Sequence, residues 1–415
     1  MGSESAGDTK VTTQITSLRE ERIEAAGNEL AALLKRAENL FGDLDLATVR
    51  AWKGAHAGAR AIGHMPIYVP REVIHAAGML PVGILGGGDR LEIIRGDAYF
   101  QSYICHIPRS TIELALSRKL DALDGMLFPS ICDVIRNLSG MWSLLFPDRY
   151  VRYIDVPQNY DAKLGGAFWK QEVSILREDL ARMAGRAITD SDLQQSITVY
   201  NANRRAIREM YAARRRQPWF FPTSELYLVL RAGNLLPPEE HTALIREYLR
   251  LAPLEAGRTE QDQSRVVLVG MFCEQPPLGL LRTIERAGCW VVDDDLLLGQ
   301  RWLREDVSIE GDPLDALVDA FLQHSTPTAS RYEPSGDRGR WIVDAVRGSK
   351  AEGVIFCAPS FCDPALLEQP MLTAALDRER IPHTQFKYSE DTGQFAVIRE
   401  QAGTFSDSIR LWSEA

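Results

Sequence analysis

The stretch 61-AIGHMPIYVPREVIHAAGMLPVGIL-85 decides the fold. Residues 61–66 form a short apolar run suited to a buried strand, and 71–77 favour a helix that Gly78 closes. Residues 80–85 form a second apolar run, which ends at the glycines 86–88. A strand, a helix and a second strand in such close succession are typical of a parallel sheet that helices cover on both faces.

The same alternation continues on the C-terminal side of this stretch, and two helices precede it. Predicted strands are 125–129 and 150–156, and predicted helices are 15–40, 46–56, 108–119 and 133–144. From 164 to 254 the pattern is almost purely helical, with segments at 169–183, 190–214, 223–231 and 238–251. We interpret this part as a helical insert between two α/β units.

Strand–helix alternation resumes after residue 265. Predicted strands are 266–271, 289–292, 353–356 and 383–387, and predicted helices are 277–286, 313–322, 341–346, 363–376 and 394–409. No repeat appears at the periods of 20–50 residues that mark solenoids. The fold class that follows is α/β, with two doubly wound parallel-sheet domains flanking a helical segment. The expected domains are 1–45 (tail and helix), 46–163 (first α/β domain), 164–260 (helical segment) and 261–415 (second α/β domain).

Composition narrows the class of protein. The 415 residues are too many for one ordinary core, which agrees with two or three domains. A net charge of −10 argues against a nucleic-acid surface. No apolar run reaches the roughly 20 residues that a membrane span needs, and residues 1–14 lack the basic start and apolar core of a secretory signal. We therefore expect a cytoplasmic protein with no membrane partner.

Three of the six cysteines occupy the same kind of position. Cys105, Cys132 and Cys362 each stand immediately before a predicted helix, the latter two directly after a strand. Ligand sites in open α/β sheets gather there, and a helix N-terminus stabilises a thiolate. Because two belong to the first α/β unit and one to the second, a shared site would lie between the domains. Thiolates select iron–sulfur clusters, zinc or copper(I); the alternative is three unrelated buried cysteines.

Other candidates have both a functional and a structural interpretation. Gly86, Gly87 and Gly88 could let backbone amides approach a ligand's phosphate, or could form a flexible strand-end loop. His106 could donate a proton or a hydrogen bond beside Cys105, or could be a solvated histidine at a helix start. Asp293–Asp295 is interpreted as a strand-end turn and helix cap. Gly348-Ser349-Lys350 lacks the upstream glycine of a P-loop, so ATP chemistry, if it occurs at all, is expected elsewhere.

Five blocks in this order resemble the benzoyl-CoA reductase / 2-hydroxyacyl-CoA dehydratase family. They are IGHMPIYVPREVIHAAGMLPVGILGG (62–87), SYICHIPRSTIEL (102–114), FPSICDVIRNL (128–138), CWVVDDDLLLGQR (289–301) and a closing block that begins with SFCDPALLEQPML (360–372). The resemblance covers about 51–412 and is weakest in the helical middle. It implies that Cys105, Cys132 and Cys362 hold a [4Fe–4S] cluster. Glu72 matches a family position close to the cleft, which implies a substrate-side role; the alternative is a carboxylate that the helix dipole favours at a helix start. Cys289 and Cys357 are expected in the core, and nothing requires Cys273 to be a ligand.

Within this family, the motifs look most similar to the smaller cluster-bearing subunits of ATP-dependent benzoyl-CoA reductase, the C-type more than the B-type. The resemblance implies an oxidoreductase subunit that transfers electrons at low potential to an aromatic acyl-CoA. Its implied partners are a homologous cluster-bearing subunit, ATP-hydrolysing iron–sulfur activator subunits and reduced ferredoxin. The alternatives are a 2-hydroxyacyl-CoA dehydratase subunit and a non-catalytic scaffold subunit.

Overall fold

Two four-stranded parallel sheets form the framework of the protein, as predicted. The computed structural model describes residues 24–101, 103–272, 276–326, 331, 338–389 and 395–413. The first sheet has the order β2-β1-β3-β4 and the second the order β6-β5-β7-β8. Their strands are β1 (Ala61–His64), β2 (Leu80–Gly83), β3 (Gly125–Pro129), β4 (Tyr150–Ile154), β5 (Ser264–Val269), β6 (Cys289–Asp294), β7 (Gly353–Pro359) and β8 (His383–Tyr388).

Helices connect the strands and cover the sheets. In the first half these are a helix over 24–41, α2 (Ala47–Ala55), α3 (Arg71–Ala76), α4 (His106–Leu116) and α5 (Asp133–Leu145). The middle of the chain contains α6 (Ala167–Ala184), α7 (Asp190–Arg216), α8 (Thr223–Ala232) and α9 (Pro238–Leu251). The second half contains α10 (Leu278–Arg286), the π-helical turn η5 (Leu297–Arg301), α11 (Pro313–His324), α12 (Arg340–Ser349), α13 (Asp363–Arg378) and α14 (Phe395–Ser413).

The two sheets are structural repeats of each other. In both, the first strand lies between the second and the third, so the strand order reverses between β1 and β3 and again between β5 and β7. The registers correspond: Ile62 pairs with Gly125, the first residue of β3, and Val266 pairs with Gly353, the first residue of β7. Each repeated unit takes up about half of the chain, so this repeat is much longer than the 20–50 residues of a solenoid repeat.

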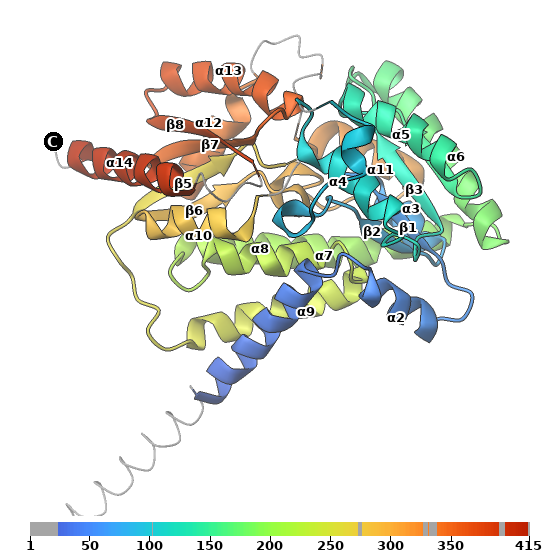
Figure 1. Ribbon diagram of the computed structural model, residues 1–415, viewed down its shortest axis with the longest axis horizontal. Helices are drawn as coiled ribbons and strands as arrows, with labels where there is room; N and C mark the ends of the chain where they lie inside the picture. The colour runs from blue at the N-terminus through green and yellow to red at the C-terminus, as the bar shows by residue number, and fades with distance from the viewer. Residues whose placement is uncertain are drawn as a thin grey trace, which may run out of the picture.

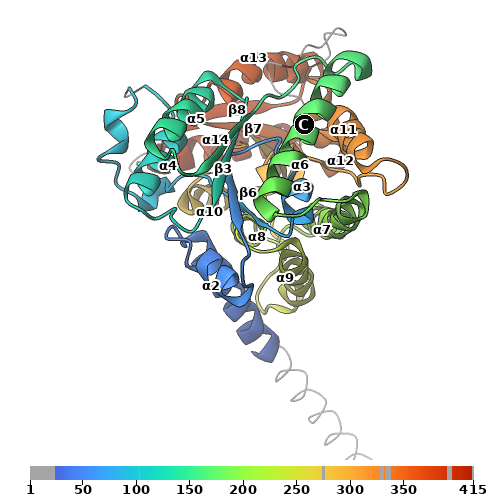
Figure 2. The ribbon, with the colours of Figure 1, turned by 90° about the vertical axis from the view of Figure 1, so that its right-hand side faces the viewer.

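The helical middle joins the two halves. Figure 1 shows α7, α8 and α9 along one side of both sheets, and α7 contacts both α3 and β6. At 27 residues α7 is about 40 Å long, enough to reach across both. The helix over 24–41 lies beside α9 in both views (Figure 1, Figure 2), where Arg36 pairs with Glu240 and Arg250 with Glu29.

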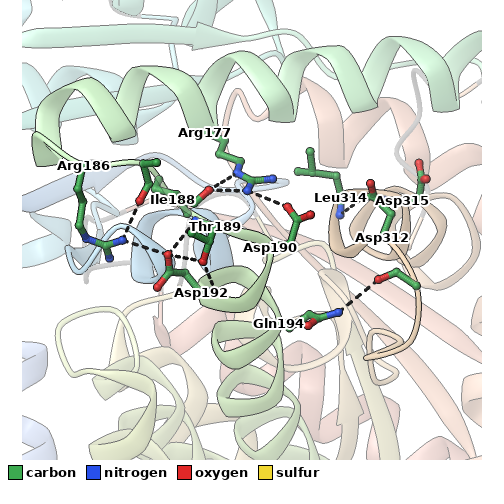
Figure 3. A network of polar contacts seen from close by, with 12 residues as sticks. Arg177, Arg186, Ile188, Thr189, Asp190, Asp192, Gln194, Asp312, Leu314 and Asp315 are labelled. Carbon is green, nitrogen blue, oxygen red and sulfur yellow. Dashed lines mark hydrogen bonds and ion pairs between the residues drawn. The ribbon is translucent and has the colours of Figure 1, made fainter.

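The start of α7 is held by a polar network (Figure 3). Thr189 and Asp192 form a reciprocal capping box, which satisfies backbone N–H groups at the helix N-terminus. Arg186 of the preceding turn pairs with Asp192, and Arg177 of α6 pairs with Asp190. These contacts fix the angle between α6 and α7.

Strand boundaries differ from the predictions for simple reasons. β1 ends at His64 rather than at residue 66, because Pro66 has no N–H to donate to a neighbouring strand. β7 continues to Pro359, three residues past its predicted end, since β8 pairs along its whole length. One large hydrophobic cluster includes buried residues from both sheets and from the helical middle. The four domain boundaries therefore stay predictions. Among the described helices, none is long and apolar enough to span a membrane.

Candidate functional site

Two equivalent loops carry Cys132 and Cys362. β3 ends at Pro129 and α5 begins at Asp133, with Cys132 as its N-cap residue. β7 ends at Pro359 and α13 begins with Cys362 as its N-cap residue. The sequences of the two loops are PSICD (129–133) and PSFCD (359–363). Four of the five residues are identical, which is the sequence signal of the structural repeat, but the two copies are too far apart to stand out as a repeat.

Two backbone hydrogen bonds of each loop also correspond. The N–H of Ser130 donates to Ile154 in β4, and the N–H of Ser360 donates to Tyr388 in β8. The carbonyl of each cysteine accepts from the residue four positions later, which starts the helix. Both cysteines therefore stand at the carboxyl end of the third strand of their sheet, next to the point where strand order reverses.

The thiols of Cys132 and Cys362 lie near each other although 230 positions separate them. Burial raises the pKa of the Cys132 thiol to about 11, and the charges of Cys362 and Asp363 add to the rise, while backbone N–H groups at the start of α5 oppose it. Cys362 is buried and Cys132 is partly exposed. The two halves thus bring their equivalent thiols to one place.

Cys105 belongs to another connection, the one between β2 and β3. It is the N-cap residue of α4 and is buried. The helix that it begins contacts α5, the helix that follows Cys132. Cys105, Cys132 and Cys362 therefore have the same local setting: a thiol at a helix N-terminus, where the helix dipole favours a thiolate.

A mononuclear metal site does not form in the described part of the chain. No three His, Cys, Asp or Glu side chains there lie close enough to surround one ion. The donor set, three thiols at helix N-termini with two of them adjacent, fits an iron–sulfur cluster.

The other cysteines lie apart from this region or outside the described residues. Cys357 is inside β7 and Cys289 begins β6, and both are fully buried, as predicted for core residues. Burial raises the pKa of Cys289 to about 12 and that of Cys357 well above its usual value. Cys273 lies outside the described residues.

Glu72 is buried on α3 and faces the helical middle. Its Oε1 accepts from Arg204 of α7 at 2.5 Å, and the Arg204 guanidinium also donates to Asn201. Its second oxygen, Oε2, has no hydrogen-bond partner among the described residues. The ion pair explains why a carboxylate is buried here, and the unpartnered oxygen remains available to a ligand.

His106 and the three glycines lie in the first half of the molecule. His106 is the first residue of α4 and is buried beside Cys105, so it is not the solvated histidine of the structural alternative. Gly86 and Gly87 pack closely: an added Cβ would stand 2.2 Å from Ser110 Oγ and 2.4 Å from Leu91 Cβ, respectively. Gly88 has a φ of +55° and open space around it. Packing alone accounts for Gly86 and Gly87.

The interpretation of Asp293–Asp295 as a turn and cap is incomplete. Asp294 does accept from the N–H of Leu296, as a turn residue would. All three side chains are buried, however, and the first two pair with α7: Asp293 with Arg215 at 2.5 Å and Asp294 with Arg214 at 2.8 Å. The run therefore fastens the second sheet to the helical middle. Sequence patterns could not separate this role from a cap, since the partner arginines are about 80 positions away.

A buried ionic cluster supports the helix that carries Cys362. Arg301 of η5 donates to Glu368 of α13 at 2.7 Å and lies 3.7 Å from the centre of the Phe272 ring. Asp295 accepts from the N–H groups of Gly270 and Met271. Burial raises the pKa of Asp295 to about 7, against the effect of Arg301. Arg301 and Glu368 are 67 positions apart, so the sequence alone does not indicate that they pair.

Comparisons with known proteins point to one family. The family model "2-hydroxyglutaryl-CoA dehydratase, D-component" matches residues 66–409. The chain is 54% identical to the C-type subunit of benzoyl-CoA reductase from Thauera aromatica, over 92% of this chain and 99% of that protein. It is 30% identical to the beta subunit of (R)-2-hydroxyglutaryl-CoA dehydratase of Acidaminococcus fermentans, and 28% identical to the (R)-phenyllactyl-CoA dehydratase beta subunit of Clostridium sporogenes. These two matches each cover 85% of this chain and more than nine-tenths of the relative.

Proposed function

Because the chain belongs to the 2-hydroxyglutaryl-CoA dehydratase D-component family, we propose that it is the C-type subunit of an ATP-dependent benzoyl-CoA reductase. The observation that carries this choice is the 54% identity to the Thauera C-type protein over nearly the whole of both chains, against 28–30% for the dehydratase subunits. In this proposal the subunit helps to reduce an aromatic acyl-CoA to a cyclohexadienoyl-CoA. The proposed location is the cytoplasm.

Cys105, Cys132 and Cys362 are the proposed ligands of a [4Fe–4S] cluster. The duplicated loop supports this assignment, since it places two equivalent thiols together at the strand ends where α/β proteins bind ligands. When bound, the cluster would supply single electrons at low potential. The chain contributes three helix N-termini whose dipoles favour thiolates, and buried surroundings that limit water.

Two further residues have proposed roles toward the substrate. His106, buried next to Cys105, is the proposed donor of a proton or a hydrogen bond near the cluster. Glu72 is the proposed substrate-side carboxylate, with Oε1 fixed by Arg204 and Oε2 unpartnered among described residues. Gly86–Gly88 remain a proposed contact for coenzyme A, and Gly88 is the one with free space.

The proposed partners follow from the missing parts of the reaction. The site is completed by a homologous protein that bears a second cluster. ATP-hydrolysing iron–sulfur activator subunits, reduced by ferredoxin, drive the electron transfer. This chain has no P-loop of its own.

Reconstitution tests the proposal. The cluster-loaded chain is assayed anaerobically alone, then with the homologous subunit, and then with the activator subunits, MgATP and a strong one-electron donor. We expect dienoyl-CoA from benzoyl-CoA only in the complete mixture. Dehydration of a 2-hydroxyacyl-CoA, with no reduction of benzoyl-CoA, would instead identify a dehydratase subunit. Turnover by this chain alone without ATP would contradict the proposal.

A further inference from the structure

A cavity of about 550 Å³ lies between the helical middle and the second half. One wall is a single face of α7, which presents Arg204, Arg208, Tyr211 and Arg215 at helical spacing. The opposite wall consists of Leu298 and Gly299 of η5 and residues 303–305, and the end of α11 closes one side. The volume is within the usual range for sites that hold a small molecule.

The lining of this cavity is rich in arginine. Arg204, Arg208, Arg215 and Arg304 all line it, in a chain whose net charge is −10, and Glu305 is the one acidic side chain among the lining residues. Three of these arginines are held by carboxylates that do not line the cavity. Arg204 pairs with Glu72, Arg208 with Asp306 and Arg215 with Asp293. Ion pairs with carboxylates outside the cavity therefore orient their guanidinium groups before any ligand binds.

Arg304 is different from the other three. Among the described residues its guanidinium has no carboxylate within ion-pair distance and no hydrogen-bond acceptor, while its backbone carbonyl accepts from Arg208. The side chain is half-buried, and burial lowers its pKa; the charges of Asp293 and Glu305 partly oppose this, while Arg215 and Arg301 lower the pKa further. Holding a guanidinium without a paired counter-ion in such a place is unfavourable, and a bound anion would relieve that cost.

A purely structural role explains only part of this arrangement. Ion pairs that fasten α7 to its neighbours account for Arg204, Arg208 and Arg215, each of which has its carboxylate. They do not account for Arg304, which lines the same cavity and fastens nothing among the described residues. Four cations around an open space of this size fit an anion with several oxygens.

We infer that this cavity binds a phosphorylated ligand, with Arg304 as its principal contact. Guanidinium groups bind phosphate oxygens through paired N–H donors in a fixed geometry. Ile207, Leu298 and Leu303 add apolar surface beside the arginines, which suits a ligand that carries a base or another apolar part. The same chemistry could come from the nucleotide end of coenzyme A or from a free nucleotide. The inference does not depend on the proposed reductase activity.

Binding measurements on the full chain test this inference. Calorimetric titrations at constant ionic strength would use four probes: coenzyme A, 3′-dephospho-coenzyme A, ADP and inorganic phosphate. We expect at least one probe to bind, and Arg304→Gln to weaken that binding at least tenfold. The matched control is Arg347→Gln, which removes an exposed arginine paired with Glu379 and absent from the cavity lining, and should leave affinity unchanged. If coenzyme A binds more tightly than its 3′-dephospho form, the ligand is coenzyme A. If ADP binds as tightly as coenzyme A, the ligand is a free nucleotide.

A second variant keeps Arg304 and changes only the charge of the cavity. Gln323, exposed near the end of α11, lines the cavity, so Gln323→Glu adds a carboxylate without removing a contact of the fold. We expect it to weaken binding at least fivefold, with an unchanged thermal unfolding midpoint. The inference is overturned if no probe binds, or if the affinity of the bound probe is the same in the wild type, Arg304→Gln and Gln323→Glu.

Discussion

The two halves of the molecule have the same sheet order and the same P-S-x-C-D loop, but they support their cysteine differently. Six residues after Cys132, α5 has Leu138, which is fully buried among apolar residues. At the equivalent position after Cys362, α13 has Glu368, which pairs with the buried Arg301. The thiol and the P-S-x-C-D pattern are common to both halves, while the packing behind them is apolar in one and ionic in the other.

The halves also differ in the third cysteine. Cys105 comes from the connection between β2 and β3, and the equivalent connection between β6 and β7 contains no cysteine, since none occurs between Cys289 and Cys357. Two ligands of the proposed cluster are thus products of the duplication, and the third is particular to the first half. Three ligands leave one iron of a cubane with a position for another group.

The largest expected effect is loss of the cluster. Cys132→Ser and Cys362→Ser should deplete iron and sulfide equally, because their loops are equivalent, and Cys105→Ser should do the same. Cys289→Ser and Cys357→Ser are matched controls in buried strands and should leave iron content near normal. The measurement is iron and sulfide content after anaerobic purification. If Cys357→Ser loses as much iron as Cys362→Ser, the choice of Cys362 over Cys357 as the cluster ligand is wrong.

The second-largest expected effect is a loss of stability when the residue behind Cys362 is replaced by its counterpart in the first half. Glu368→Leu places the residue of the first half at the equivalent position of the second, and removes the carboxylate that lies 2.7 Å from Arg301. We expect the free energy of unfolding to fall by about 3–5 kcal/mol, the usual cost of removing one member of a buried ion pair. Glu379→Leu, which removes the carboxylate beside the exposed Arg347, should cost less than about 1 kcal/mol. Similar values for the two variants in denaturant titrations would show that the ionic support contributes little.

The free energy of unfolding should fall at acid pH because of a histidine in β1 that has no counterpart in β5. His64 occupies the position in β1 that Leu268 occupies in β5, as their pairing with Leu127 and Ile355 shows. Burial, together with Arg71, lowers the pKa of His64 to about 3.

The direction of the pH effect follows from this shift. Below the unfolded pKa of about 6.5 the unfolded chain takes up a proton that the folded chain does not. The contribution of His64 to stability is therefore present above that pH and is lost as pH falls towards 3. Between about pH 7.5 and about pH 5, His64 should lower the free energy of unfolding by about 2 kcal/mol. In His64→Leu the free energy of unfolding should fall by that much less over the same pH range. An identical drop in wild type and variant would contradict this assignment.

The smallest expected effect concerns the residue before each cysteine. Phe361 has a φ of 64°, in the left-handed region, whereas the equivalent Ile131 is not among the residues with positive φ. Phe361→Gly should therefore raise the free energy of unfolding by about 0.5–1 kcal/mol, since glycine adopts this conformation without strain. Ile131→Gly should lower it by about 1 kcal/mol. Destabilisation of similar size in both, measured by urea unfolding, would show that the loops have the same backbone preference.

Much of the fold can be predicted from sequence because it depends on local patterns. All eight strands lie where the sequence pattern predicts them. Six are largely buried and follow from short apolar runs between turn residues, whereas the edge strands β4 and β8 are partly exposed. The position of Cys132 and Cys362 at strand ends follows for the same reason. The ion pairs of Asp293 and Asp294, the partner of Arg301 and the arginine-lined cavity could not be predicted. They depend on residues that are far apart in sequence, and charge patterns on α7 look the same whether its arginines face solvent or a cavity.

Iron and sulfide analysis of the anaerobically purified chain tests the central claim most directly. If Cys105, Cys132 and Cys362 hold one cubane, the chain should contain about four iron and about four sulfide ions, little zinc, and the reduced sample should give the electron paramagnetic resonance signal of a [4Fe–4S]⁺ centre. Zinc without sulfide, or no metal at all after reconstitution with iron and sulfide, would contradict the account.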